Sequence, residues 1–174
     1  MRARCHFALV AAGAMALVAL GVPQAGVAAE PGSRAAIDQA AAVNTELALA
    51  YMREGNLKAA REKIDKALQQ DARTANTQMA AGFVYDKLGD KKKALSHFEQ
   101  AVKLGGKDNP DVVANAAVYF CMNGEPKRGE QYMLQAAASP LNARPDVAYA
   151  NAGRCARGDG RAKDAEQSFR KALA

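Results

Sequence analysis

The sequence of 174 residues contains no tryptophan, and only 6% of its residues are aromatic. A β-sandwich would need many more aromatic and β-branched side chains to fill the space between its two sheets. Hydrophobic residues nevertheless make up 49% of the chain, and alanine is abundant among them. This composition favours a single domain of closely packed helices with small residues at their contacts.

Histidine is also rare, which limits the chemistry that the chain can perform. Outside the N-terminal segment only His97 remains, between Ser96 and Phe98. Catalysis there would need a nucleophile or carboxylate partner, and no such spacing occurs. The histidines and cysteines are too few for a zinc site, and no phosphate-binding glycine loop is present. We therefore predict a protein that is not an enzyme and has no cofactor or metal, with His97 at its surface.

The N-terminus has the pattern of an export signal. Arg2 and Arg4 form a basic start, an apolar run covers residues 7–22, and small residues follow. This order predicts a signal peptide over residues 1–29. The alternative is a permanent membrane anchor, but the run is shorter than the roughly 20 residues of a spanning helix. We expect a periplasmic protein in which residues 30–40 are a linker or the start of the first helix.

Removal of that leader would change the charge and the cysteine count. The remaining chain would have 22 basic and 18 acidic residues, a net charge of +4 that does not call for a nucleic-acid partner. It would keep Cys121 and Cys155 but not Cys5. An even pair of cysteines in an oxidising compartment is a candidate disulfide.

The sequence contains an internal repeat. Gly55, Gly89, Gly124 and Gly160 are separated by 34, 35 and 36 residues. Four other kinds of position keep the same phase, namely a preceding ring, two small residues and a large apolar residue. The ring position is occupied by Tyr51, Tyr85 and Phe120, and by Ala156 in the fourth copy. The first small position is occupied by Ala60, Ala94, Gly129 and Ala165, and the second by Ala67, Ala101, Ala136 and Ala172. The large apolar position is occupied by Ile64, Phe98, Met133 and Phe169.

Each repeated position has a physical reason. A glycine adopts the left-handed conformation that ends a helix without strain. Asn56 and Asp90 are suitable N-caps for the helix that follows, and Pro126 suits the first position of such a helix. The small residues allow two helices to approach, and the bulky ones fill the space between hairpins. No single hairpin can bury its own apolar face, so the copies must stack.

This pattern resembles the tetratricopeptide repeat (TPR), a unit of 34 residues. The resemblance implies an all-α fold, a right-handed superhelical stack of helix-turn-helix repeats over residues 41–174. By phase the copies cover residues 41–74, 75–108, 110–143 and 146–174, the last one incomplete. Such folds act as scaffolds that bind other proteins.

Several segments are similar to a narrower family, the type IV pilus biogenesis and stability proteins PilF and PilW. They are residues 44–51 (NTELALAY), 115–121 (NAAVYFC), 139–141 (SPL) and 151–155 (NAGRC). The resemblance implies a scaffold that binds the outer-membrane secretin or another pilus component, with at most peripheral membrane contact and a possible association with the outer membrane. The alternative is a generic periplasmic adaptor for adhesion-pilus export, envelope maintenance or cell division.

In TPR folds the first helix of each repeat lines a concave groove. The groove positions of this sequence include Thr45, Leu49, Met52, Arg53 and Lys87. We expect partner binding at Met79, Phe83, Asn115, Val118, Met122, Asn151 and Arg154. An exposed apolar patch with polar groups suits an amphipathic helix or an extended segment. An asparagine amide can both donate to and accept from a peptide backbone. The alternatives are that Asn115 and Asn151 only bridge neighbouring helices, and that Phe83 belongs to the core.

Cys121 and Cys155 fall on the first helices of the third and fourth copies. Adjacent first helices line the same wall, so a bridge between the two cysteines is geometrically reasonable. A disulfide that closes this loop would add roughly 3–4 kcal/mol of stability. The alternative is two buried free thiols that act as small apolar side chains. The two cysteines do not form a Cys-x-x-Cys pair, which argues against a redox role.

Overall fold

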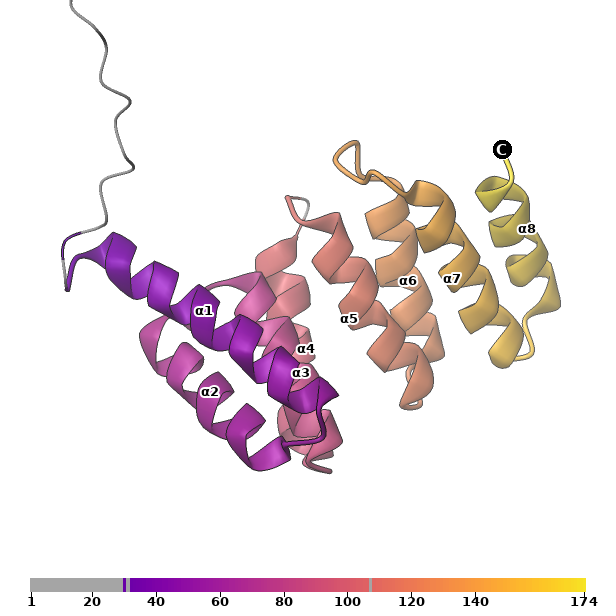
Figure 1. The fold of residues 1–174 in the computed structure, drawn as a ribbon. Helices are drawn as coiled ribbons and strands as arrows, with labels where there is room; N and C mark the ends of the chain where they lie inside the picture. The colour runs from indigo at the N-terminus through magenta and orange to yellow at the C-terminus, as the bar shows by residue number, and fades with distance from the viewer. Residues whose placement is uncertain (1–29, 31, 107) are drawn as a thin grey trace, which may run out of the picture.

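The structure is a computed structural model that describes residues 30, 32–106 and 108–174. The predicted signal peptide, residues 1–29, lies outside this part of the chain. The described residues form eight helices and no strand, which confirms the all-α class (Figure 1). They are α1 (Arg34–Arg53), α2 (Leu57–Gln70), α3 (Ala75–Lys87), α4 (Lys91–Gly105), α5 (Pro110–Met122), α6 (Pro126–Ala137), α7 (Pro145–Gly158) and α8 (Ala162–Ala172).

The helices pack in pairs that follow one another along the array. α1 packs on α2, α3 on α4, α5 on α6 and α7 on α8, and the second helix of each hairpin also contacts the first helix of the next. The first helices α1, α3, α5 and α7 are neighbours in turn. Figure 1 shows the four hairpins side by side in chain order, with α1 and α8 at opposite ends. The repeat pattern therefore predicted the order of packing.

The repeated glycines lie at the turn inside each hairpin. Gly55, Gly89, Gly124 and Gly160 all have positive φ, between 75° and 89°. Other L residues rarely adopt this conformation because their Cβ clashes with the backbone. This finding confirms that the glycines end the first helices.

The starts of the second helices also follow the sequence. The Asn56 side chain accepts a hydrogen bond from the Ala59 N–H at 3.2 Å, and Asp90 caps α4 in the same way. Pro126 is the first residue of α6, where its missing N–H has no helical partner to lose. Pro145 opens α7 for the same reason, so the connector between α6 and α7 ends at Arg144.

The main core contains a continuous chain of rings from α3 to α6. The rings of Phe83 and Phe98 meet edge to face at 5.0 Å, and Phe98 stacks on Tyr119 at 4.3 Å. Tyr119, Phe120 and Tyr132 continue the chain, with centroid separations of 6.2 and 5.5 Å. Aromatic pairs at these distances stabilise a core beyond the area that they bury. The few aromatic residues are thus concentrated in the middle of the array.

His97 is not a simple surface residue, contrary to the prediction. It is half-buried, its Nδ1 lies 2.7 Å from Oε1 of Gln78, and its ring stacks on Tyr85 at 5.3 Å. Gln78 in turn donates to the backbone carbonyl of Ala72 at 2.6 Å. Burial, and secondarily the charge of Lys93, lowers the pKa of His97. Sequence reasoning missed this contact because Gln78 comes from the preceding helix.

The first helix begins before the first predicted repeat. α1 starts at Arg34, and the Ser33 hydroxyl caps it by accepting a hydrogen bond from the Ala36 N–H at 3.2 Å. Most of the stretch 30–40 is therefore helical. In the described part of the chain, no helix combines the length and the apolar character needed to cross a membrane.

Candidate partner-binding site

A pocket of about 420 Å³ lies between α5 and α7, and Pro126 and Met133 of α6 also line it. Its lining combines apolar side chains, backbone near two helix ends, and a few polar groups. The lining residues are Val118, Cys121, Met122, Gly124, Pro126, Met133, Asn151, Arg154, Cys155, Gly158 and Asp159. Two first helices, one from each of the last two hairpins, therefore form its walls.

Four of the seven predicted binding residues line this pocket, namely Val118, Met122, Asn151 and Arg154. Met122 is the most exposed of these, with 79% of its surface accessible. Val118 and Asn151 are half-buried, and Arg154 is exposed. Groove positions of two helices, α5 and α7, thus lie together in one pocket.

The other three predicted binding residues lie outside the pocket. Met79 and Phe83 of α3 are half-buried and pack against the main core. Phe83 meets Phe98 edge to face, as the core alternative expected. Asn115 is exposed on α5 but is not part of the pocket lining. Their role in partner binding stays a prediction.

Thr45, another groove position, is buried. Its hydroxyl lies 3.1 Å from that of Thr77 and donates to the Ala41 carbonyl at 2.8 Å. A small side chain at this position lets α1 approach α3 closely, so a neighbouring helix covers it. Groove position in the repeat therefore does not guarantee exposure.

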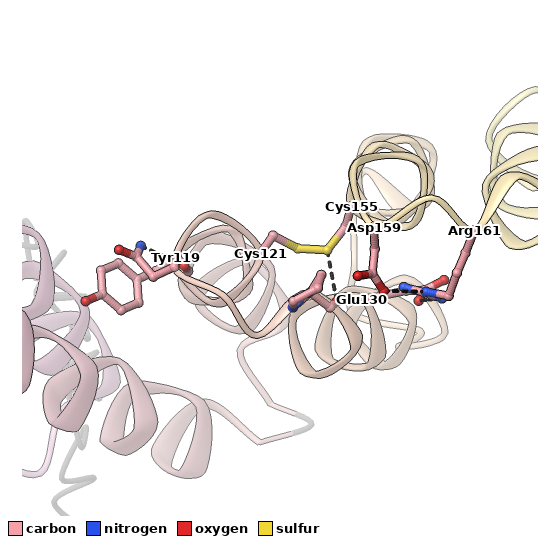
Figure 2. Close-up of a disulfide and its surroundings, with 8 residues drawn as sticks. Tyr119, Cys121, Glu130, Cys155, Asp159 and Arg161 are labelled. Atoms are coloured by element: carbon pink, nitrogen blue, oxygen red, sulfur yellow. Dashed lines mark hydrogen bonds and ion pairs between the residues drawn. A yellow bond between two sulfur atoms is a disulfide. The ribbon is translucent and has the colours of Figure 1, made fainter.

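A disulfide between Cys121 and Cys155 forms one side of the pocket (Figure 2). The two Cα atoms are 5.7 Å apart, within the usual range for such bonds. The bridge joins α5 directly to α7 across 34 residues of sequence. It holds the two walls of the pocket at a defined separation. Disulfides are typical of proteins in oxidising compartments.

Gly129 of α6 makes room for this bridge. A Cβ atom added there would lie 2.5 Å from Sγ of Cys121 and 2.8 Å from the Ala117 carbonyl oxygen. The other three copies carry alanine at this position. The glycine thus lets α6 come closer to α5 beside the sulfur, a relation that the repeat alignment did not reveal.

Ion pairs lie next to the disulfide, and they include Asp159 of the pocket lining. Arg161, at the start of α8, pairs with the Asp159 carboxylate at 2.7 Å and with Glu130 of α6. Figure 2 shows Asp159, Arg161 and Glu130 meeting beside the disulfide, while Tyr119 points away toward the preceding hairpin. Hydrogen bonds, first with Asp159 and then with Glu130, raise the pKa of Arg161. The last hairpin is therefore fixed to α6 by an ion pair and to α5 by the disulfide.

Arg154 has different surroundings. Its guanidinium donates to the Asn151 side-chain oxygen at 2.5 Å, within the same helix. Among the ion pairs of the described residues, none involves Arg154. The Asp159 carboxylate, also in the pocket lining, is engaged by Arg161. The pocket therefore presents the positive charge of Arg154, and no carboxylate in the pocket lining pairs with it.

Seven lining residues were not predicted as binding residues. Cys121 and Cys155 were predicted only as a disulfide, and the others are Gly124, Pro126, Met133, Gly158 and Asp159. Gly124, Gly158 and Asp159 lie at or just after the ends of α5 and α7. The spacing of the repeat does not predict that these helix ends share a pocket. Met133 was recognised only as a large apolar residue between hairpins. In the described ranges, no group of three or more His, Cys, Asp or Glu residues is placed to hold a metal ion.

Comparison with known proteins supports the fold. The tetratricopeptide repeat model matches residues 39–105. An uncharacterized protein of Haemophilus influenzae is 32% identical over 101 residues, which are 58% of this chain and 56% of that protein. The chain therefore spans little more than half the length of this relative.

Solved structures show the same arrangement of helices. The crystal structure of PilW, described as a widely conserved type IV pilus biogenesis factor, is 26% identical with a TM-score of 0.68, over 78% of this chain and 61% of that one. Pseudomonas aeruginosa PilF is 23% identical with a TM-score of 0.69, over 79% of this chain and 61% of that one. YrrB, described as a TPR protein with an unusual peptide-binding site, is 20% identical with a TM-score of 0.60, over 80% of this chain and 74% of that one. The last two likenesses concern the fold alone.

The described chain is thus an all-helical stack of TPR hairpins that is structurally similar to PilW and PilF. TPR arrays are protein–protein interaction scaffolds and are typically not enzymes. The fold accordingly implies a protein partner.

Proposed function

We propose that this chain is a periplasmic TPR scaffold for type IV pilus biogenesis or stability that holds a secretin or another pilus component. The observation that carries the proposal is the pocket between α5 and α7, whose two walls are tied together by the Cys121–Cys155 disulfide. A pocket with fixed walls loses little conformational freedom when a partner binds. The structural likeness to PilW supports the proposed pilus role.

In this proposal Val118, Met122, Asn151 and Arg154 contact the partner, and Asn115 extends the contact surface along α5. Met79 and Phe83 support the neighbouring part of the groove from the core side. The exposed methionine supplies apolar area, and the polar groups fix the orientation of a bound segment. The periplasmic location agrees with the disulfide and with the predicted signal peptide.

A deletion strain of the source organism tests the pilus role. Loss of the protein is expected to remove surface pili and secretin multimers, while the pilus and secretin subunits persist. Electron microscopy and blots of unboiled samples measure both. Normal pili and multimers in this strain would end the pilus proposal.

Complementation tests the pocket. Met122→Asp places a charge in the pocket, and Leu141→Asp makes the same change at another exposed apolar residue, 62% accessible, in the connector before α7. Because both side chains are exposed, both variants should fold. We expect Leu141→Asp to restore pili and Met122→Asp to fail. If pili do not depend on the protein but capture of another envelope protein depends on Met122, the generic adaptor is the better description.

A further inference from the structure

The pocket between α5 and α7 has an unusual concentration of sulfur. Cys121, Met122, Met133 and Cys155 all line it. Met133 is 2% exposed, whereas Met122 is 79% exposed. Of the eleven described residues in the lining, none is aromatic. The rings of this chain are instead concentrated in the core between α3 and α6.

Sulfur atoms in this arrangement favour aromatic rings. They are polarizable, and they contact the edges and faces of rings at about 5 Å. An unbranched methionine has three rotatable bonds, so Met122 can fold over a ring of variable size. An aliphatic partner would gain the apolar contact but not the sulfur–ring contact.

The positive charge of Arg154 indicates a second feature of the partner, namely a negatively charged group. Arg154 stands on the α7 wall, and its contact with Asn151 involves a neutral amide. The carboxylate of Asp159 is held by Arg161 at 2.7 Å and so is not free to neutralise Arg154. A carboxylate of the partner could make a charge-assisted hydrogen bond there.

We propose that the pocket receives an extended protein segment that carries an aromatic side chain close to a carboxylate. The ring lies against Met122, Met133 and the disulfide, and the carboxylate meets Arg154. This inference rests on the proposed function, since it names the chemistry of the partner that the same site holds. The disulfide sets the distance between the ring position on the α5 wall and Arg154 on the α7 wall.

Three small probes separate the two features. They are 3-phenylpropanoate, which has both; 3-cyclohexylpropanoate, which lacks the aromatic ring; and 3-phenylpropanamide, which lacks the charge. Binding is followed on the purified full-length protein by NMR of methyl-labelled methionines. The phenyl probes should move the Met122 and Met133 methyl signals by ring currents and leave that of Met79 unchanged.

We expect 3-phenylpropanoate to bind about threefold tighter than the cyclohexyl acid because of the sulfur–ring contacts. Apolar area alone would give the opposite order or no difference, since the cyclohexyl group is at least as hydrophobic. At low salt the phenyl acid should also bind about threefold tighter than the amide, a difference that falls as salt increases.

Matched variants assign each preference to a residue. Arg154→Gln should remove the preference for the acid over the amide, whereas Arg73→Gln, at an exposed arginine between α2 and α3, should not. Met122→Leu should reduce the preference for the phenyl over the cyclohexyl acid, whereas Leu141→Met, which adds a thioether at an exposed residue outside the pocket, should leave it unchanged. Both methionine changes nearly conserve volume.

Equal or tighter binding of the cyclohexyl acid would overturn the aromatic part of the inference. Equal binding of the amide at low salt would overturn the acidic part, and absence of binding by all three probes would overturn both. These outcomes are distinct from failure of the proposed function. If Met122→Asp still abolishes pili while the probes fail, the scaffold role stands and the partner chemistry is wrong.

Discussion

The middle interface, between the hairpins α3–α4 and α5–α6, differs from the last interface, between α5–α6 and α7–α8. In the middle interface, Phe98 of α4 stacks on Tyr119 of α5 at 4.3 Å. At the last interface, the contacts are a disulfide, an Arg161–Glu130 ion pair and a small apolar cluster with Met133 at its centre. The two interfaces join equivalent repeats by different physical means.

The difference follows from the repeat positions themselves. The ring that precedes the turn in the first three copies is replaced in the fourth by Ala156, and Cys155 stands next to it. With less apolar area to bury, the fourth hairpin gains less from packing. The covalent bond compensates by restricting the unfolded chain. A repeat with weak packing can therefore be retained in the array when a cross-link replaces rings.

The largest expected effect tests the middle interface. Phe98→Ala should lower the free energy of unfolding by about 3–5 kcal/mol, because Phe98 is fully buried and its loss leaves a cavity. Phe169→Ala, at the equivalent position of the last copy, should cost clearly less because Phe169 is only half-buried. Urea denaturation measures both. Equal losses would show that the two regions do not differ in packing.

The next effect tests the last interface. Replacing both Cys121 and Cys155 by serine should lower the free energy of unfolding by about 3–4 kcal/mol through the entropy of the unfolded chain. The loss should be local: amides of α7 and α8 should lose protection in hydrogen exchange, while those of α3 and α4 keep it. A uniform loss of protection would contradict the distinction between the two interfaces.

A third prediction compares one substitution in both regions. A Cβ at Gly82 would lie 2.8 Å from the ring of Phe98, and one at Gly153 would lie 2.6 Å from the ring of Phe169. The Phe98 ring is enclosed, so Gly82→Ala should cost about 1–3 kcal/mol by overpacking. The Phe169 ring can move toward solvent, so Gly153→Ala should be nearly neutral or stabilising, since alanine favours helices by about 1 kcal/mol.

Thermal unfolding of the two glycine variants measures this difference. Adding Phe98→Leu to Gly82→Ala should recover part of the loss, because the smaller side chain makes room for the new methyl group. A Gly153→Ala variant as unstable as Gly82→Ala would show that the last hairpin is as tightly packed as the middle of the array.

The smallest effect is a pH dependence centred on the α3–α4 hairpin, because His97 is the only histidine in the described residues. Its folded-state pKa is lowered from 6.5, so the unfolded chain binds the proton more readily. The stability that neutral His97 contributes is complete above about pH 6.5 and is lost as the pH falls from there through the folded-state pKa.

Denaturation at several pH values between about 7.5 and 5 checks this prediction against the reference pKa of histidine. His97→Gln keeps a polar side chain that can bond to Gln78 but removes the titration, so its stability should depend less on pH in this window. A slope unchanged by His97→Gln would assign the pH dependence to other groups.

Much of the fold was predictable because it depends on local periodicity. The glycines, the N-caps Asn56 and Asp90, and the proline at the start of α6 each act within one turn of their own position. The cysteine pair was predictable because the repeat places both residues on first helices. In contrast, the contact between His97 and Gln78 joins two helices and has no signal in either segment alone.

The candidate site was predictable only in part. Groove positions located Val118, Met122, Asn151 and Arg154, since repeat phase fixes the face of a helix on which a residue lies. The same rule also selected Thr45 and Phe83, which neighbouring elements partly or fully cover. The position of a residue in the repeat predicts the direction of its side chain. It does not predict how close the next helix lies, and that distance decides whether the side chain is exposed.

The sequence by itself determined that the chain forms paired helices, where each pair turns, and the order in which the pairs stack, because these depend on residue type at regular intervals. Only the tertiary structure decided that one pocket forms between α5 and α7 and that Gly129 makes room beside the disulfide. It also decided that no carboxylate of the described residues forms an ion pair with Arg154. These features depend on how closely helices from different repeats approach, and that distance results from the packing of all the side chains between them.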